Sequence, residues 1–261
     1  MAVPLRQSVR TATYLARQRI ARREKFPLLV ELEPLYQCNL ACSGCGKIQH
    51  PDHVLRRRMP VDQAIAAIEE SGAPMVSIAG GEPLIHPEID EIARQLIQRK
   101  KFVYLCTNAV LMEKKLDLFE PSPYFAWAIH LDGLRERHDA SVEREGVFDK
   151  AVSAIKAAQE RGFRVTTNTT FFTHDSPETV RQVLDFINDE LEVDQMMISP
   201  AYAYEKAPDQ DHFLGVKETH KLFSAAFAAL IAATALSKTP SRHTDSSWRS
   251  FRPSMCTAQA K

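Results

Sequence analysis

Short runs of β-branched and aromatic residues alternate with longer stretches in which apolar residues recur at helical spacing, between residues 28 and 200. One of these stretches places Val61, Ile65 and Ile68 on one helical face. Another begins at Ser176, a favourable N-cap that is followed directly by a proline. The apolar runs predict six strands, at residues 28–33, 75–80, 102–107, 126–131, 164–172 and 193–200.

This alternation of strands and helices predicts an α/β fold with a parallel sheet and helical crossovers. The strands are near-continuous apolar runs, which indicates that both faces of the sheet are covered. An open doubly wound sheet and a partial barrel both fit the pattern, because spacing alone does not distinguish them. In either architecture, binding and catalytic residues are expected at the carboxyl ends of the strands.

The flanks differ from this core. Residues 1–25 contain seven basic residues and one acid, and their apolar residues form one helical stripe, so they predict a basic amphipathic helix. Residues 26–215 are expected to form the sheet domain, and residues 216–236 a C-terminal helix. Residues 237–261, rich in Ser, Thr and Arg without periodicity, are expected to be disordered or an aberrant end of the reading frame.

Composition narrows the function. The chain has 261 residues, of which 44% are hydrophobic and 25% charged, and its net charge is zero with a pI near 7.1. The lack of a basic excess argues against general nucleic-acid binding. The start has no apolar leader, and the longest apolar run, Leu222 to Leu236, is too short and too interrupted to span a membrane. We therefore expect a cytoplasmic enzyme with reduced cysteines.

Three of the five cysteines, Cys38, Cys42 and Cys45, form a C-x3-C-x2-C motif directly after the first predicted strand. Thiolates suit iron–sulfur clusters or zinc. A [4Fe–4S] cluster held by three cysteines leaves one iron open to a substrate or cofactor. The alternative is a zinc site completed by a distant residue such as His50 or Cys256, but structural zinc sites usually close with paired ligands and no second C-x2-C is present.

Other chemically distinctive residues also follow strands. The turn after the second predicted strand contains Gly80, Gly81 and Glu82. Glycine lets a ligand approach the backbone closely, and the glutamate can accept a hydrogen bond from an ammonium group, so this turn is a candidate binding segment. Cys106 lies on one strand face with Tyr104 and Asn108, where a thiol is either a small buried apolar group or a hydrogen-atom donor. The candidates at strand ends are Gly80, Gly81, Glu82, Pro83, Cys106, His130 and Asn168.

Together, the cysteine motif, the GGEP turn and the HLDGLRERHD segment after strand four resemble the radical S-adenosylmethionine enzymes over about residues 26 to 200. The resemblance implies a partial (β/α)6 TIM-like barrel. It also implies a [4Fe–4S] cluster on the three cysteines, and S-adenosylmethionine on the open iron. The GGEP segment would hold the methionine amino group, and flavodoxin or ferredoxin would supply electrons. Gly44 departs from the family pattern, which commonly has an aromatic residue before the third cysteine.

His130 is a second departure, since the family usually has a small polar residue at the end of strand four. His130 is interpreted either as a contact to the ribose or substrate, or as a histidine packed at a strand end. Asn168, in strand five, is assigned with it to cofactor binding.

A closer resemblance, from the N-terminus to about residue 225, is to the adenosylhopene synthases of hopanoid biosynthesis. It rests on stretches such as LEPLYQCNLACSGCGKIQ and PSPYFAWAIHLDGLRERHDASVEREGVFDKA. It implies addition of the adenosyl radical to the alkene of the triterpenoid diploptene, with Cys106 reducing the resulting carbon radical. Tyr202, Tyr204 and Phe213 would form a lid or substrate loop. The basic N-terminal helix would contact the membrane that holds the substrate, or else cap the bottom of the barrel.

Two other functions remain open at this stage. A radical enzyme of the peptide-modifying type shares the strand-four motif but typically uses further C-terminal clusters, and only Cys256 is available there. A non-catalytic iron–sulfur or zinc-binding protein would not need the glycine–acid turn after strand two.

Overall fold

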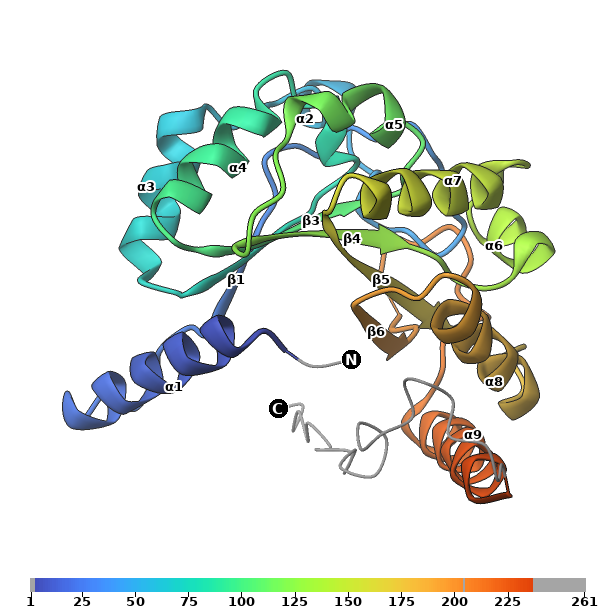
Figure 1. The fold of residues 1–261 in the computed structure, drawn as a ribbon. Helices are drawn as coiled ribbons and strands as arrows, with labels where there is room; N and C mark the ends of the chain where they lie inside the picture. Colours follow the sequence, from blue (N-terminus) through green and yellow to red (C-terminus); the bar gives the residue numbers. More distant parts are fainter. Residues whose placement is uncertain (1–2, 204, 237–261) are drawn as a thin grey trace.

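The computed structural model describes residues 3–203 and 205–236, and all six predicted strands form. They make one parallel sheet in which each strand pairs with the next strand along the chain. This sequential order lacks the reversal of a doubly wound sheet, so the partial barrel is confirmed (Figure 1). The strands are β1 (Leu29–Leu32), β2 (Met75–Ile78), β3 (Phe102–Thr107), β4 (Phe125–His130), β5 (Arg164–Phe171) and β6 (Gln195–Pro200).

The helices follow the local signals in the sequence. Ser176 caps its helix by accepting a hydrogen bond from the Thr179 N–H at 3.1 Å, and Gly72 ends an earlier helix with a φ of 67°. The α-helices are α1 (Leu5–Ile20), α2 (Asp52–Leu55), α3 (Val61–Ser71), α4 (Ile89–Gln98), α5 (Met112–Lys115), α6 (Arg135–Ser141), α7 (Val147–Glu160), α8 (Pro177–Asp185) and α9 (Val216–Leu236). Shorter turns are η1 (Pro83–Ile85), η2 (Leu116–Leu118) and the π-helical η3 (Phe186–Glu190).

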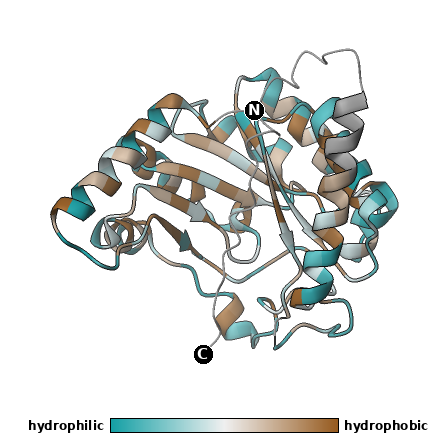
Figure 2. Ribbon diagram, turned by 90° about the horizontal axis from the view of Figure 1, so that it is seen from below, coloured by the Kyte–Doolittle hydropathy of each residue, from teal (hydrophilic) through white to brown (hydrophobic). Residues whose placement is uncertain are grey.

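The two faces of the sheet have different surroundings. On the convex face, side chains such as Ile78, Leu105 and Trp127 are fully buried beneath the helices and form the main core. On the concave face, Ser77 and Cys106 are only partly buried. The expectation that both faces are covered therefore holds for the convex face and, on the concave face, for Ala128 of β4, which is 1% exposed, but not for Ser77 and Cys106. In Figure 2 the strands carry brown, pale and teal residues, and the helices carry both brown and teal residues.

The flanking helices lie at separate places on the half-barrel. α1 projects from the amino-terminal end of the sheet, and α9 packs beside α8 through the buried Leu222 and Ala226 (Figure 1). Among the described residues, no helix is both long and apolar enough to cross a membrane. Residues 237–261, for which an irregular tail was expected, lie outside the described residues, as does Tyr204.

The loop after β1 is joined to the loop after β2 by backbone hydrogen bonds. The Gly81 N–H donates to the Leu35 carbonyl at 3.0 Å, and the Glu82 N–H donates to the Gln37 carbonyl at 2.9 Å. Contact is so close that a Cβ on Gly81 would lie 2.2 Å from the Gln37 oxygen. Glycine is required at position 81 because no larger residue leaves the two backbones room to pair.

We predict that Gly81→Ala lowers the free energy of unfolding by about 3 kcal/mol, because the added methyl group forces two paired backbones apart. Gly162→Ala is the matched control. Its glycine has a φ of +79°, and a methyl group added there would have no atom within 4 Å, so it bears only the left-handed backbone cost of about 1 kcal/mol. Urea unfolding of both variants measures the difference, and equal losses would contradict the close contact at position 81.

Candidate functional site

One cavity opens at the carboxyl ends of the strands, with a volume of about 360 Å³. Its lining includes nearly all of the residues proposed from the sequence: Cys38, Cys42, Cys45, Gly80, Gly81, Glu82, Cys106, His130 and Asn168. Pro83 is the exception, because it is buried at the first position of η1 and does not line the cavity. These nine residues come from five separate segments of the chain and meet at one place, as expected for the strand ends of a barrel.

The three cysteines lie in the loop after β1, where each thiol is free and partly exposed. The Leu40 N–H points at the Cys38 sulfur at 3.4 Å. Burial, followed by the nearby Cys45 and Cys38, raises the pKa of Cys42 to about 12, and burial also raises the pKa of Cys38. Grouped thiols of this kind resist ionisation in the absence of a cation, whereas bound iron would deprotonate them.

An apolar wall lies behind this loop. Leu40, Val142 and Val147 are buried together, and Cys38 and Cys42 pack against them. In the part of the chain that the structure describes, no three His, Cys, Asp or Glu side chains are placed to hold one metal ion. Three thiols, two of them backed by apolar side chains, suit an iron–sulfur cluster, whose usual ligands are cysteine thiolates.

Glu82 connects the second loop to the end of β3. Its carboxylate is 1% exposed and accepts hydrogen bonds from the Leu84 N–H at 3.0 Å, the Thr107 hydroxyl at 2.7 Å and the Asn108 N–H at 2.9 Å. Burial raises the pKa of Glu82 despite these donors. Two carboxylate oxygens provide about four lone-pair sites, so one further donor, such as an ammonium group, can still be accommodated.

Cys106 lies on the concave face of β3 and lines the cavity on the sheet side. Its sulfur is 3.4 Å from the Ser77 hydroxyl oxygen, on the neighbouring strand β2. Burial raises the pKa of the Cys106 thiol, so the group stays protonated and keeps its S–H bond. No sequence pattern indicates the Ser77 contact, which joins residues 29 positions apart.

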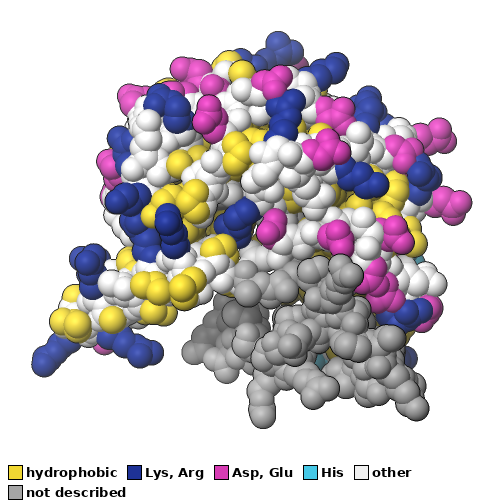
Figure 3. Space-filling view, viewed as in Figure 1, with side chains coloured by type: hydrophobic (Ala, Val, Ile, Leu, Met, Phe, Trp, Pro, Cys, Tyr) yellow, Lys and Arg dark blue, Asp and Glu magenta, His cyan; other side chains and the backbone are white. Residues whose placement is uncertain are grey.

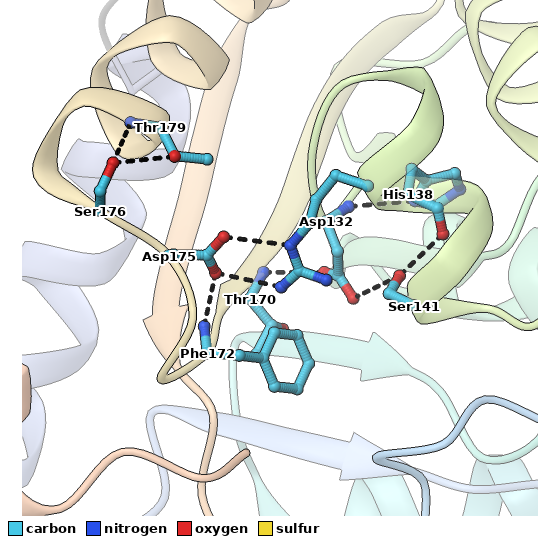
Figure 4. A network of polar contacts seen from close by, with 9 residues as sticks. Asp132, His138, Ser141, Thr170, Phe172, Asp175, Ser176 and Thr179 are labelled. Carbon is cyan, nitrogen blue, oxygen red and sulfur yellow. Dashed lines mark hydrogen bonds and ion pairs between the residues drawn. The ribbon is translucent and has the colours of Figure 1, made fainter.

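His130 and Asp132 form a pair at the end of β4. The His130 Nε2 lies 2.6 Å from the Asp132 carboxylate. The same carboxylate accepts a hydrogen bond from the Thr170 N–H at 2.8 Å (Figure 4). Burial by itself would lower the pKa of His130, but the charge of Asp132, its hydrogen bond to the ring and the charge of Glu82 together raise that pKa. The His138 Nδ1 accepts from the Asp132 N–H at 3.1 Å. His130 is therefore oriented by its neighbours with its ring at the cavity wall.

A further network, which sequence reasoning missed, fixes an aromatic ring beside the cysteine loop. Asp175 accepts two hydrogen bonds from Arg137, at 3.0 and 3.1 Å, and one from the Phe172 N–H at 2.7 Å (Figure 4). The Arg137 guanidinium also lies over the Phe172 ring, 5.1 Å from its centroid. Arg137 belongs to the HLDGLRERHD segment, but no pattern in the sequence pairs it with Asp175 or Phe172.

The Phe172 ring lies against Gly44, the position at which the chain departs from its family pattern. A Cβ on Gly44 would be 3.3 Å from the Phe172 ring and 3.2 Å from the His212 ring. Phe172 lines the same cavity as the cysteines, and its ring meets that of His212 edge to face, with centroids 5.1 Å apart. Aromatic surface beside the third cysteine is therefore present, but it comes from the end of β5 and from a distant loop.

The chain resembles known proteins over the region that builds this cavity. The family model described as "Radical SAM superfamily" matches residues 32–187. GTP 3′,8-cyclase 1 of Mycobacterium tuberculosis (strain CDC 1551 / Oshkosh) is 29% identical over 147 residues, which are 52% of this chain and 41% of that protein. Fe-coproporphyrin III synthase of Methanosarcina barkeri (strain Fusaro / DSM 804) is 27% identical over 49% of this chain and 33% of its own length. The matched region thus spans less than half of either relative, and neither name concerns a hopene.

Among solved structures, Streptococcus suis SuiB bound to S-adenosylmethionine superposes with a TM-score of 0.69. It is 19% identical and covers 85% of this chain and 52% of that chain. The structure titled "Native anSMEcpe with bound AdoMet and Cp18Cys peptide" gives a TM-score of 0.56 at 20% identity, over 80% of this chain and 61% of that one. At these identities, the likeness establishes the shared fold.

The cofactors of this superfamily are a [4Fe–4S] cluster and S-adenosylmethionine. The residues of the cavity fit both, because three thiols suit iron and the turn of Gly80, Gly81 and Glu82, which carries a buried carboxylate, lines the same cavity. The family model spans more than half of the chain and covers the cysteine loop, the glycine turn and the ends of β3, β4 and β5. The chain belongs to the radical SAM superfamily.

Proposed function

We propose that this protein transfers the 5′-deoxyadenosyl group of S-adenosylmethionine to the alkene of a hopene such as diploptene, giving adenosylhopane. The observation that supports this most directly is the protonated thiol of Cys106, which lines the same cavity as Cys38, Cys42 and Cys45. An enzyme that only abstracts hydrogen would be hindered by a reactive S–H bond in its pocket. Addition to an alkene leaves a carbon radical that needs such a donor.

Each group of cavity residues has a role in this proposal. Cys38, Cys42 and Cys45 would hold the cluster, which supplies the electron that cleaves the sulfonium. Gly80, Gly81 and Glu82 would receive the methionine amino group, and His130 and Asn168 would contact the nucleoside. Pro83 would support this turn indirectly, by fixing the backbone at the first residue of η1. Phe172 would supply the aromatic contact for adenine next to Gly44.

Transfer of a hydrogen atom from Cys106 to the carbon radical requires one further electron to complete the catalytic cycle. Addition forms a carbon–carbon bond and leaves an unpaired electron on the tertiary carbon of the former alkene. The Cys106 S–H bond breaks homolytically, and its hydrogen atom completes the product. One electron and one proton then restore the thiol. We assign both electrons of the cycle to a flavodoxin or ferredoxin, by resemblance to the family.

The mouth of the cavity supports an apolar substrate. Pro200, Ala201, Tyr202 and Phe213 line it after β6, and Tyr202 is 68% exposed, so aromatic surface is available to a hydrocarbon skeleton. A triterpene of this kind resides in a bilayer. The proposal therefore includes peripheral contact with the inner face of the membrane by a cytoplasmic enzyme, whose reduced thiols that compartment would preserve.

Loss of one cysteine of the loop should abolish cluster binding. We predict that Cys42→Ala, reconstituted anaerobically with iron and sulfide, loses the iron–sulfur absorption, because two thiolates cannot retain a cube that needs three. Cys106→Ala is the matched control and should keep the full iron content, since Cys106 lies on the sheet across the cavity. Iron and sulfide analysis checks both, and an intact cluster in Cys42→Ala would contradict the ligand assignment.

The reaction class is tested by incubating the reconstituted protein with S-adenosylmethionine, a reductant and diploptene, and following the adenosine moiety by mass. A product that joins adenosine to the triterpene supports addition. Free 5′-deoxyadenosine as the only product, with or without GTP or a peptide present, would point to hydrogen abstraction and overturn the proposal.

Isotope labelling tests whether Cys106 is the hydrogen-atom donor. In D₂O the thiol exchanges, so the wild-type product should carry deuterium at the former alkene carbon. We predict that Cys106→Ala still cleaves S-adenosylmethionine but forms about 10²-fold less reduced product, the size typical of losing a positioned hydrogen-transfer group. Ser77→Ala, which keeps the thiol, should retain the label. Unchanged deuteration in Cys106→Ala would exclude the assigned role.

A further inference from the structure

α1 packs against the barrel with its polar side. Gln7 is 5% exposed, and its side-chain amide donates to the Tyr104 hydroxyl at 2.7 Å and points at the Met75 sulfur at 3.4 Å. Tyr14, two turns later on the same side, donates its hydroxyl hydrogen to the Pro27 carbonyl at 2.7 Å. The barrel-facing side of this helix is thus held by polar contacts to the amino-terminal end of the sheet.

The opposite side of α1 carries an apolar stripe, consisting of Leu5, Val9, Ala12, Ala16 and Ile20. All five residues are exposed, and Leu5, Val9 and Ile20 are 78%, 56% and 82% accessible. Figure 3 shows hydrophobic side chains along this helix, with lysine and arginine side chains around them. A surface helix normally turns its apolar face to the protein core, so this reversal marks a surface with a partner.

A basic cleft lies between α1 and the neighbouring loops of the barrel. It has a volume of about 530 Å³ and is lined by Arg10, Thr13, Tyr14, Arg17, Gly72, Ala73, Pro74, Lys100 and Lys101. Four of these nine side chains are cationic and none is acidic. Lys101 donates to the Ala73 carbonyl at 2.7 Å, and burial and the nearby Arg10 lower its pKa. Cationic side chains therefore predominate in the lining of the cleft, and the nearby Glu69 offsets only part of their charge at Lys101, because the pKa of Lys101 is still lowered.

On a helical projection, the arginine side chains of α1 flank the apolar stripe. Arg6, Arg10 and Arg17 lie on one side of it and Arg19 on the other, and residues 5–20 contain no acid. Two copies of such a helix would repel one another across their arginines, so self-association through this face is disfavoured. Apolar side chains between arginines complement a bilayer surface that carries anionic headgroups.

We propose that α1 lies on an anionic lipid bilayer, with the apolar stripe inserted among the acyl chains and the basic cleft receiving the phosphate of a lipid headgroup. The polar contacts of Gln7 and Tyr14 hold the helix to the barrel in this orientation. The inference deepens the membrane contact on which the proposed function rests. It is measured without substrate or turnover, so failure of vesicle binding and failure of adenosyl transfer are separate results.

The test is co-sedimentation of the full chain with vesicles of phosphatidylcholine alone or of phosphatidylcholine and phosphatidylglycerol. Wild-type protein should bind the anionic vesicles, and binding should weaken between 0.1 and 1 M salt, as the screening length falls from about 10 to about 3 Å. Equal binding to both vesicle types, or no binding to either, would overturn the proposal.

Substitutions separate the stripe from the cleft. Leu5→Ser combined with Val9→Ser should weaken vesicle binding by about 100-fold, because each buried aliphatic side chain contributes about tenfold or more. Leu118→Ser, an equally exposed apolar position in η2 that is 52% accessible, should change nothing. Wild-type binding by the stripe variant would exclude the stripe as the contact. Thermal melting of each variant confirms that the fold is retained.

For the cleft, Arg17→Gln with Lys100→Gln should weaken binding to anionic vesicles by about fivefold for each cation removed. Arg57→Gln with Arg58→Gln removes two exposed cations from another loop and should have no such effect. Equal losses in both pairs would show a general charge effect and contradict a specific cleft. Inorganic phosphate at millimolar concentration is added as a competitor of the lipid headgroup. If it fully displaced the protein from the vesicles, the cleft would be assigned to a free anion and not to a lipid.

Discussion

The buried carboxylate of Glu82 is the contact on which the rest of the site depends. It accepts hydrogen bonds from its own turn and from two groups at the end of β3, while the adjoining backbone pairs with the loop that carries the cysteines. Three segments that are distant in sequence are thereby fixed at one edge of the sheet. A buried carboxylate without these donors would be costly, so the donors and the acid stabilise one another.

The far side of the cavity is organised in the same way around two buried acids. Asp132 positions His130 and the backbone of β5, and Asp175 positions Arg137 and the backbone at Phe172. In each case a carboxylate accepts a hydrogen bond from a backbone N–H at or just after the end of β5 and also holds a charged or titratable side chain in place. The loops at the strand ends gain rigidity from these charge-assisted hydrogen bonds.

The division between the two faces of the sheet explains how the fold can hold both a core and a reactive site. The convex face is packed beneath the helices with large apolar side chains, which supply stability. The concave face carries small polar groups and a thiol, which leave space and supply chemistry. Because successive residues of a strand point to opposite faces of the sheet, each strand contributes side chains to the core and to the concave face.

The sequence by itself determined the positions of the six strands and of the cysteine loop, since these follow from local periodicity and spacing. It also placed nine of the ten candidate residues at one cavity. Only the tertiary structure decided that Phe172 and His212 occupy the space beside Gly44, that Ser77 contacts Cys106, and that α1 turns its apolar stripe away from the barrel. These contacts join residues far apart in the chain, and a local pattern shows that a helix has an apolar face but not which surface that face meets.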